Sequence, residues 1–398
     1  MKFRANVVIL FLWIGVFASS CSLLPREKVW LYFPQDMATV GEELTIEGRA
    51  YDRDGITGLV LSIVHSPTGR QTEYPLHRLA SVSGGKVLVQ LSKFRQIITF
   101  GDEGAYVLTV SMTDKSGHTF VSKPVNIRCV FGTPGSEFKT FSRSHWIPLL
   151  ILLLMNIVMV GVCRRSETAA KNIPYAISAI LWGNELVFHL WHFLLGSWSI
   201  TTNLLLHMCG MAIVFIPFML HHPNEKVKKA LFNLLYFWGF GGALQALLTP
   251  DIGVYGFPSY RYFAAFISHG FIITAVVYMI WVKKYRISFS IMWKVYAITV
   301  AFVIVMYGVD LLIAYLPPYE PGSYFFLIYP PVDGSVIDLL VKLFGPSPRY
   351  ILGLLLLGLG IFIILTIPFA LSGSVVSFLQ KRRMAYSNSG VPDEMTES

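Results

Sequence analysis

The pattern of hydrophobic and polar positions divides the chain into two parts with different periods. Between residues 28 and 130, short segments rich in β-branched residues alternate with the turn sequences DRDG, SPTG, SGG, GDEG and DKSG. Short strands separated by turns at roughly ten-residue spacing are typical of an antiparallel β-sandwich. We therefore expect an all-β domain, with strands at ELTIEGRAY, GLVLSIVH, KVLVQL, AYVLTVSMTD and KPVNIRCV.

After residue 145 the pattern changes to long apolar runs. Each is long enough to cross about 30 Å of hydrocarbon at about 1.5 Å per helical residue. The expected fold class is a polytopic α-helical membrane protein with seven transmembrane helices and an N-terminal all-β sandwich. The runs cover residues 146–163, 173–195, 203–221, 230–248, 262–282, 291–315 and 350–379.

The run TVGEELTIEGRAYDRDGITGLVLSIV resembles bacterial immunoglobulin-like domains, so an immunoglobulin-like sandwich is expected over residues 28–130. That likeness concerns the fold and specifies no chemistry. His65, His77 and His118 are scattered in this domain, form no catalytic cluster and are expected at its surface. An envelope ligand is the partner expected for such a domain.

The first 21 residues have the layout of a secretory signal. Lys2 and Arg4 precede an apolar stretch, and small residues lead to Cys21. The same layout resembles a bacterial lipoprotein signal, in which Cys21 would be lipidated after cleavage. The alternative is a retained signal anchor, and both place the following domain outside the membrane.

Charge placement predicts the topology. Hydrophobic residues make up 54% of the chain and charged residues only 14%, against about 25% in a soluble domain. Basic clusters follow the first, third, fifth and seventh runs, and basic loops remain cytoplasmic. We therefore expect residues 28–130 outside a bacterial inner membrane, a linker at 131–145, a seven-helix domain at 146–380 and a cytoplasmic tail at 381–398. The net charge of +9 is thereby explained without nucleic acid.

Polar side chains within the runs gather at one depth. Because consecutive runs alternate in direction, five of them bring polar residues to the outer half of the bilayer. An ionisable residue inside a span is costly and is usually functional. The shared depth predicts a polar pocket formed by Glu185, His189, His192, Asn203, His207, Cys209, Gln245, His269, Tyr307 and Asp310.

Helix geometry sorts these residues. Glu185, His189 and His192 are spaced i, i+4, i+7 and share one face. His207 and Cys209 differ by about 200° around a regular helix, so they cannot face one point. If Cys209 is a nucleophile, its base comes from another helix, and His269 has the matching depth. An adjacent imidazole can convert a buried thiol into a thiolate.

Five segments follow one another in the membrane part: WGNELVFHLWHF, LHMCGMAIVFIPFML, YFWGFGGALQALLTPDI, RYFAAFISHGFII and YGVDLL. Over about residues 145–380 this ordered set resembles the transmembrane protein 164 family, which includes bacterial YwaF-like integral membrane proteins. The resemblance implies a cysteine-dependent acyltransferase that moves an acyl chain from a phospholipid to a lysophospholipid, without a cofactor. It implies Cys209 in LHMCG as the nucleophile and His269 in ISHG as its partner. The outer sandwich is not part of that pattern.

In such a mechanism the remaining polar residues have supporting roles. Asn203, Gln245 or Tyr307 would donate a hydrogen bond to the oxyanion, and Asp310 would orient His269. The expected partners are membrane phospholipids.

Two other functions stay open at this point. In the first, Glu185, His189, His192, His207 and His269 would bind zinc in a metal-dependent membrane hydrolase, because imidazole and carboxylate groups suit that metal. In the second, the protein would be an envelope sensor whose sandwich binds a ligand. Seven spans exceed what an anchor requires, and an anchor needs no buried histidine or cysteine.

Overall fold

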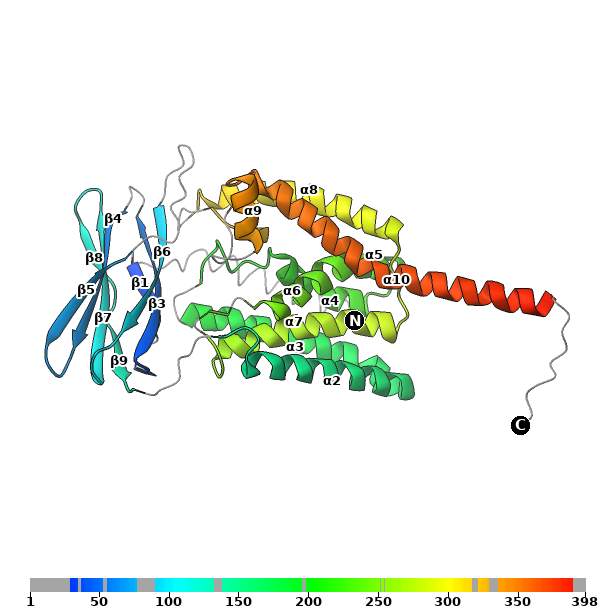
Figure 1. The fold of residues 1–398 in the computed structure, drawn as a ribbon, viewed down its shortest axis with the longest axis horizontal. Coiled ribbons are helices and arrows are strands. Elements are labelled where there is room, and N and C mark those ends of the chain that lie inside the picture. Colours follow the sequence, from blue (N-terminus) through cyan, green and yellow to red (C-terminus); the bar gives the residue numbers. More distant parts are fainter. Residues whose placement is uncertain are drawn as a thin grey trace.

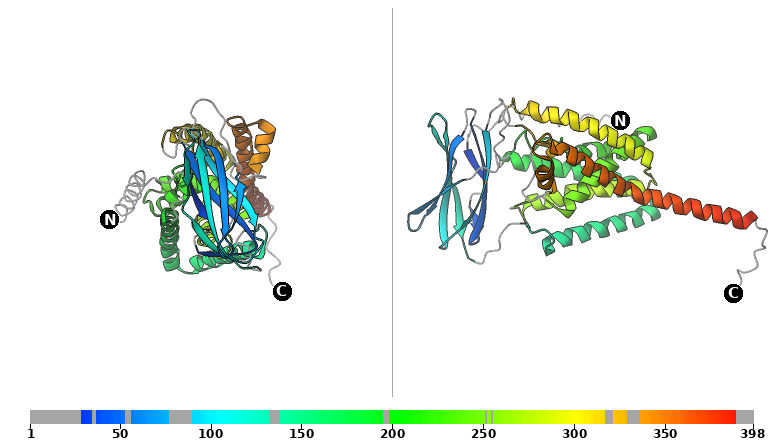
Figure 2. Two further views of the ribbon diagram at one scale, coloured as in Figure 1. Left: turned by 90° about the vertical axis from the view of Figure 1, so that its left-hand side faces the viewer. Right: turned by 45° about the horizontal axis from the view of Figure 1, so that its top comes forward.

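The computed structural model describes residues 29–34, 37–52, 56–76, 90–131, 138–194, 198–250, 252–253, 255–316, 321–328 and 336–388. The signal segment with Cys21, His77 and the end of the expected tail lie outside these residues. The described chain consists of a β domain followed by a helical domain. Figures 1 and 2 show the β domain at one end of the helices, with the last turns of α10 at the other.

The β domain contains two sheets that share one core. The first has the strand order β1-β3-β6, and the second has the order β2-β9-β7-β4-β5 with β8 paired to β7. Buried residues from both sheets, such as Ile46, Phe94, Leu61 and Leu108, form the core between them. The strands are β1 (Val29–Phe33), β2 (Ala38–Val40), β3 (Glu43–Asp52), β4 (Ile56–His65), β5 (Arg70–Pro75), β6 (Gln90–Thr99), β7 (Gly104–Asp114), β8 (Thr119–Val121) and β9 (Val125–Cys129).

One strand lies only partly within the described residues, and one histidine is placed differently from the expectation. Of the strand expected at KVLVQL, residues 86–89 lie outside the described part of the chain, and residues 90–91 begin β6 (Gln90–Thr99), whose whole length pairs with β3. His65 is buried rather than exposed. Its ring packs against Tyr106 at 4.6 Å between centroids, and its Nδ1 atom is 2.8 Å from the hydroxyl of Thr68. His118 is exposed, as expected.

The helical domain follows the expected apolar runs, and a further short helix, α9, lies before the last of them. A π-helical turn, η1, joins α5 to α6, and a single 3-10 turn, η2, follows α8. The elements are α2 (Arg143–Arg165), α3 (Glu167–Leu194), α4 (Met208–His221), α5 (Glu225–Leu235), η1 (Tyr236–Phe240), α6 (Gly241–Leu248), α7 (Tyr260–Trp281), α8 (Phe289–Ile313), η2 (Tyr324–Phe326), α9 (Val336–Phe344) and α10 (Tyr350–Asn388).

Five helical segments of the described chain are long and apolar enough to cross a membrane. These are α2, the continuous α5-η1-α6 segment, α7, α8 and the first part of α10. The helix in the third run is shorter than expected, because residues 203–207 are not helical and α4 begins at Met208. Hydrogen bonds hold the preceding residues in turns: the Asn203 side chain accepts from Ser199 N, and Leu204 N donates to the Tyr324 hydroxyl.

Two boundaries also differ from the sequence pattern. Part of the expected linker is helical, since α2 begins at Arg143. At the other end α10 continues to Asn388, so the expected tail begins as a continuation of the last helix.

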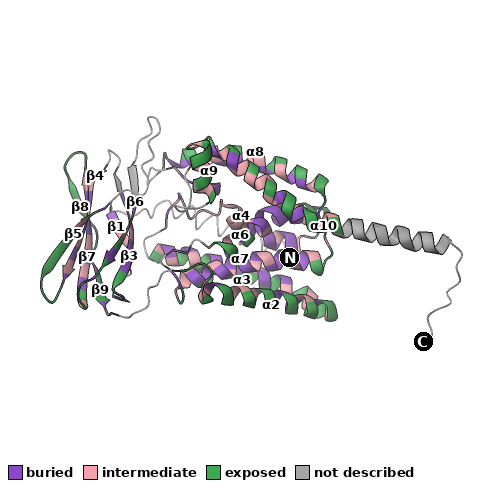
Figure 3. Ribbon diagram, in the orientation of Figure 1, coloured by how far each residue is buried: buried purple, intermediate pink, exposed green. Residues whose placement is uncertain are grey.

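Burial separates central from peripheral helices (Figure 3). In the most apolar 18-residue stretch of α7, 56% of the residues are buried, against 17% in α2 and 11% in α10. The outward faces of the peripheral helices are apolar, for example at Leu150 and Leu154 of α2 and Leu352 and Leu356 of α10. An apolar outer surface of this kind suits contact with lipid.

The β domain contacts the loop before α7. The ring of Phe33 in β1 meets the ring of Tyr255 edge to face at 5.4 Å, and Tyr255 in turn contacts Trp191 of α3 at 5.5 Å. Arg49 of β3 is buried, and its charge acts on His192 near the end of α3. The sandwich therefore covers the end of the helical domain at which α3 ends and α7 begins.

Candidate functional site

Cys209 lies in the first turn of α4, partly exposed, against the backbone of the neighbouring segment. Its Sγ atom is 3.1 Å from the point that a β-carbon on Gly242 would occupy. Glycine at position 242 therefore makes room for the sulfur. Because α4 begins at Met208, the backbone N–H groups at the start of its first turn, to which Cys209 belongs, have no acceptor within the helix.

A second glycine, Gly239, lies where η1, α4 and α7 meet, about one helical turn further from the sandwich than Cys209. A β-carbon on Gly239 would stand 3.2 Å from the β-carbon of Ala212 and 3.2 Å from the Ile272 side chain. Gly239 belongs to the π-helical turn Tyr236–Phe240, whose wider backbone path offsets the following turns. Small residues at such contacts allow helices in membranes to approach closely. The sequence YFWGFGG thus builds the wall behind Cys209.

His269 lies at the same level as Cys209. Cys209 precedes Ala212 by three residues, and His269 precedes Ile272 by three residues, so each lies about 4.5 Å from the Gly239 contact along its helix. Both α4 and α7 begin at the end nearest the sandwich, so these displacements have the same direction. In the described part of the chain the two side chains are not hydrogen-bonded to each other. The fold places both residues at the same depth, on two helices, α4 and α7, that contact each other.

A backbone hydrogen bond fixes the tautomer of His269. Its Nδ1 atom lies 2.8 Å from the carbonyl oxygen of Ala265, one turn earlier in α7. A carbonyl oxygen only accepts, so Nδ1 carries the proton and donates it. In the neutral ring the lone pair is then on Nε2, and this atom has no hydrogen bond to any described residue. The imidazole is thereby prepared to accept a proton at Nε2.

The carboxylate that acts on His269 is Glu185, from α3. Glu185 is buried, interacts electrostatically with His269, and has an oxygen 3.2 Å from Nε2 of His189. The Nδ1 atom of His189 accepts a hydrogen bond from the indole N–H of Trp198 at 3.0 Å, so its proton lies on Nε2, toward Glu185. A neighbouring hydrogen bond also joins α3 to α7: the Asn184 side chain donates to the Ser268 hydroxyl at 2.7 Å.

Asp310 has partners in another part of the bundle. One oxygen of its fully buried carboxylate accepts from the backbone N–H of Tyr324 at 3.0 Å, and its backbone carbonyl accepts from Gly322 N at 3.0 Å. The expected pairing with His269 is not among its contacts. Asp310 instead holds the segment that contains η2, because a short loop folded into the bundle needs acceptors for its N–H groups.

That loop closes the space beside His207. The Tyr324 hydroxyl donates to Ile200 O at 2.6 Å, and the backbone N–H of Phe325 donates to Nδ1 of His207 at 3.3 Å. Phe325 and Phe326 both have positive φ angles, 59° and 57°, a conformation that is strained for aromatic residues. Such strain persists only where surrounding contacts enforce it. Here the enforcing contacts are made with residues 200–207, which directly precede Cys209 and the start of α4.

The other expected residues lie around this centre with local partners. The Asn203 side-chain oxygen closes the turn from Ser199, and exposed Gln245 donates to Gly241 O in its own helix at 3.1 Å. Tyr307 is partly buried on α8 and interacts electrostatically with Tyr350. His192 is buried against the rings of Phe188 and Trp191.

His145 is a buried residue that the sequence pattern did not single out. Its Nδ1 atom accepts from Phe141 N at 2.9 Å, and Nε2 donates to Leu247 O at 2.7 Å. Both ring nitrogens are therefore occupied in joining the start of α2 to the end of α6. The only sequence signal is a histidine immediately before a long apolar run.

Among the described residues, no group of three or more His, Cys, Asp and Glu side chains has a geometry suited to a metal ion. The residues of the suggested zinc site are divided: Glu185 and His189 pair on α3, whereas His207 contacts the η2 loop.

Comparison with known proteins relates the chain to one family. No curated protein matches it. A family model, that of the TMEM164 family, matches residues 140–366. This match includes α2 to α8, η2, α9 and most of the apolar part of α10, and every residue of the site described above. It covers more than half of the chain, and the protein therefore belongs to the TMEM164 family.

Proposed function

We propose that this protein is a membrane-embedded acyltransferase that moves an acyl chain from a phospholipid to a lysophospholipid through a thioester on Cys209. The observation that supports the proposal is that the side chains of Cys209 and His269 lie at the same depth on two helices in contact. One is a thiol seated against Gly242 in the first turn of α4. The other is an imidazole on α7 whose proton is held on Nδ1 by Ala265 O.

The first half-reaction forms the thioester. The thiol of Cys209 gives its proton to Nε2 of His269, and the sulfur attacks the ester carbonyl carbon. The ester C–O bond then breaks, and the leaving alkoxide takes the proton from Nε2 to become the hydroxyl of a lysophospholipid. Hydrogen bonds between catalytic groups are often completed only when substrate binds, so the proposal requires this contact in the substrate complex and not in the free protein.

The second half-reaction reverses these steps with another lysophospholipid. Its hydroxyl gives a proton to Nε2 of His269, and its oxygen attacks the thioester carbonyl. The C–S bond breaks, and the thiolate takes the proton back from His269. If water replaces the acceptor hydroxyl, the same site releases a fatty acid.

Two groups stabilise charge during these steps. The N–H groups at the start of α4 would stabilise a tetrahedral oxyanion formed at Cys209, since helix N-termini favour anions. Backbone groups then take the role that Asn203, Gln245 and Tyr307 were expected to have. The carboxylate of Glu185 acts on His269 and stabilises the imidazolium that forms in each half-reaction.

The same proposal includes seven membrane crossings, with the sandwich outside and basic loops inside. Apart from the five long apolar segments, α3 has 28 residues and α4 has 14, extended by the turns before Met208. The basic residues Lys228, Lys229, Lys283 and Lys284 lie at helix ends away from the sandwich. This distribution supports a cytoplasmic position for those ends.

We further propose that the sandwich is immunoglobulin-like. Tyr106, near the start of β7, donates from its hydroxyl to Asp102 O at 2.8 Å, the arrangement called a tyrosine corner in such domains. The parallel pairing of β2 with β9 brings the first part of the domain onto the sheet that contains the last strand.

The test is a transfer assay with purified protein in lipid nanodiscs. The donor is a phospholipid with a labelled acyl chain, and the acceptor is a lysophospholipid. Cys209→Ala and His269→Gln should fold and purify like the parent but transfer no label, because alanine has no nucleophile and an amide cannot shuttle protons. Full transfer by Cys209→Ala, with loss on addition of a chelator, would instead establish the metal-dependent reading.

A further inference from the structure

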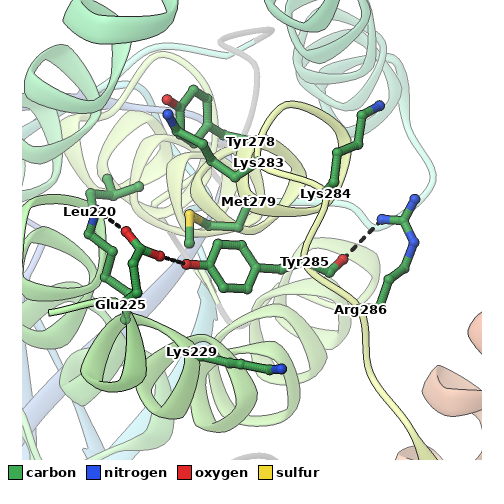
Figure 4. Close-up of a pocket in the computed structure, with 10 residues that line it drawn as sticks. Leu220, Glu225, Lys229, Tyr278, Met279, Lys283, Lys284, Tyr285 and Arg286 are labelled. Carbon is green, nitrogen blue, oxygen red and sulfur yellow. Dashed lines mark hydrogen bonds and ion pairs between the residues drawn. The ribbon is translucent and has the colours of Figure 1, made fainter.

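A basic cavity lies at the end of the helices opposite the sandwich. It has a volume of about 450 Å³ and is formed by the start of α5, the end of α7 and the loop that joins α7 to α8. Its walls carry five cationic side chains: Lys228, Lys229, Lys283, Lys284 and Arg286. Figure 4 shows Tyr285 and Met279 in the middle of the cavity, with lysine and arginine side chains around them. Because α7 has 22 residues, this cavity is about 33 Å from the start of α7.

The cations exceed the acidic groups that neutralise them. Glu225 is the single carboxylate among the residues that line the cavity, so four positive charges remain uncompensated there. Glu225 contacts Lys228 at 3.0 Å and accepts a hydrogen bond from the Tyr285 hydroxyl at 2.5 Å. Burial and this carboxylate raise the pKa of Tyr285 to about 12, so the phenol stays neutral and adds no negative charge.

The cationic loop has a fixed backbone. Lys284 has a φ of 64°, and Tyr285 N donates to Met279 O at 3.0 Å, which turns the chain back over the end of α7. Arg286 donates from Nη1 to the carbonyl oxygens of Ile280 and Tyr285, both at 2.9 Å. A left-handed lysine is unfavourable unless surrounding contacts stabilise it. The loop is therefore built to hold its charges in this arrangement.

The floor of the cavity is apolar. Leu220 and Met279 are buried and line it together with the ring of Tyr278, above which Lys283 Nζ lies at 5.8 Å. A ligand that fits this surface has an anionic part for the rim and an apolar part for the floor. At the end of membrane helices, a phospholipid has both.

We propose that this cavity binds the phosphate head group of an anionic membrane phospholipid, with the start of its acyl chains directed toward Leu220 and Met279. Basic pockets between helices at the cytoplasmic side are suited to such head groups, and a volume of this size is within the range of ligand pockets. Leu220 follows Cys209 by eleven residues along α4, so the cavity begins about 16 Å from Cys209, and it uses none of the residues of that site. It is independent of the proposed acyl transfer and concerns the leaflet opposite the sandwich.

The competing explanation is that these cations serve only to orient the helices. A matched pair of variants separates the two. Lys229→Gln with Lys283→Gln removes two charges from the cavity while the side chains stay polar and only one atom shorter. Lys226→Gln with Lys294→Gln removes two charges from exposed positions on the same helices or the next one, outside the cavity.

The experiment titrates each full-length protein, purified in a neutral detergent, with fluorescently labelled phosphatidylglycerol. Labelled phosphatidylcholine is the zwitterionic control, and inorganic phosphate and glycerol 3-phosphate serve as soluble competitors. We expect the cavity variant to bind phosphatidylglycerol at least tenfold more weakly and the matched variant to stay within twofold of the parent. An equal loss of phosphatidylglycerol affinity in both variants would mean that general surface charge explains the binding, and it would overturn the proposal. Equal binding of the two lipids, or competition by soluble phosphate as strong as that of the lipid, would overturn it as well.

Discussion

The Sγ atom of Cys209 lies 3.1 Å from the position that a β-carbon on Gly242 would occupy. This distance is shorter than most contacts made by real β-carbons, so any side chain at position 242 would displace the sulfur. The sulfur occupies the space that a side chain at position 242 would fill. Its position therefore depends on where the α5-η1-α6 segment places the backbone of Gly242.

Gly242→Ala tests this relationship. We expect about a tenfold loss of acyl transfer, because displacing a reacting atom by less than 1 Å already weakens catalysis strongly. The helix itself gains from the change, since alanine is favoured over glycine in a helix by roughly 0.5–1 kcal/mol. The rate of transfer and the unfolding temperature are measured together.

The matched control is Gly308→Ala, because no atom lies within 4 Å of a β-carbon at that helical position. It should keep full activity. Equal activity in the two alanine variants would show that Gly242 does not position the thiol.

Glu185→Gln tests the carboxylate that acts on His269. The change removes a buried negative charge and keeps the size of the side chain, so the imidazolium loses its stabilising partner. We expect kcat to fall by about 10²-fold. Asp310→Asn is the comparison, because an amide oxygen can still accept from Tyr324 N. A larger loss in Asp310→Asn than in Glu185→Gln would restore Asp310 as the group that supports the base.

Phe33→Ala tests the contact between the sandwich and the helical domain. Loss of the ring that meets Tyr255 should loosen the loop before α7 without unfolding the sandwich, because Phe33 lies at the edge of the sandwich core. Hydrogen–deuterium exchange of residues 255–259 should become severalfold faster. Val121→Ala, on an exposed side chain of β8, serves as the control. Unchanged exchange in Phe33→Ala would mean that this contact does not order the loop.

The sequence predicted the division of the chain into a β domain and a helical domain and the common depth of the two candidate residues on α4 and α7. Strand-length and membrane-length patterns identify both domains because burial between two sheets and burial in lipid impose different periods. The common depth of Cys209 and His269 follows from counting residues along helices of known rise. These properties depend on local pattern and therefore appear in a single sequence.

The remaining features depend on contacts between distant segments. The late start of α4 results from hydrogen bonds of residues 199–204 to one another and to Tyr324, more than a hundred residues later. The choice of Glu185 over Asp310 depends on which faces of α3, α7 and α8 are adjacent, which depth alone does not specify. His65 and His145 are buried because partners elsewhere in the chain satisfy their ring nitrogens.

The thioester mechanism is tested by a search for an acyl group on Cys209. The protein is incubated with a phospholipid that carries a labelled acyl chain, without acceptor, and then denatured and treated with neutral hydroxylamine, which cleaves thioesters. We expect label on the parent protein that hydroxylamine releases, label located by mass spectrometry on the peptide containing Cys209, and none on Cys209→Ala. A parent protein that turns over substrate with no labile label, or a Cys209→Ala variant that transfers acyl chains at the parental rate, would contradict it.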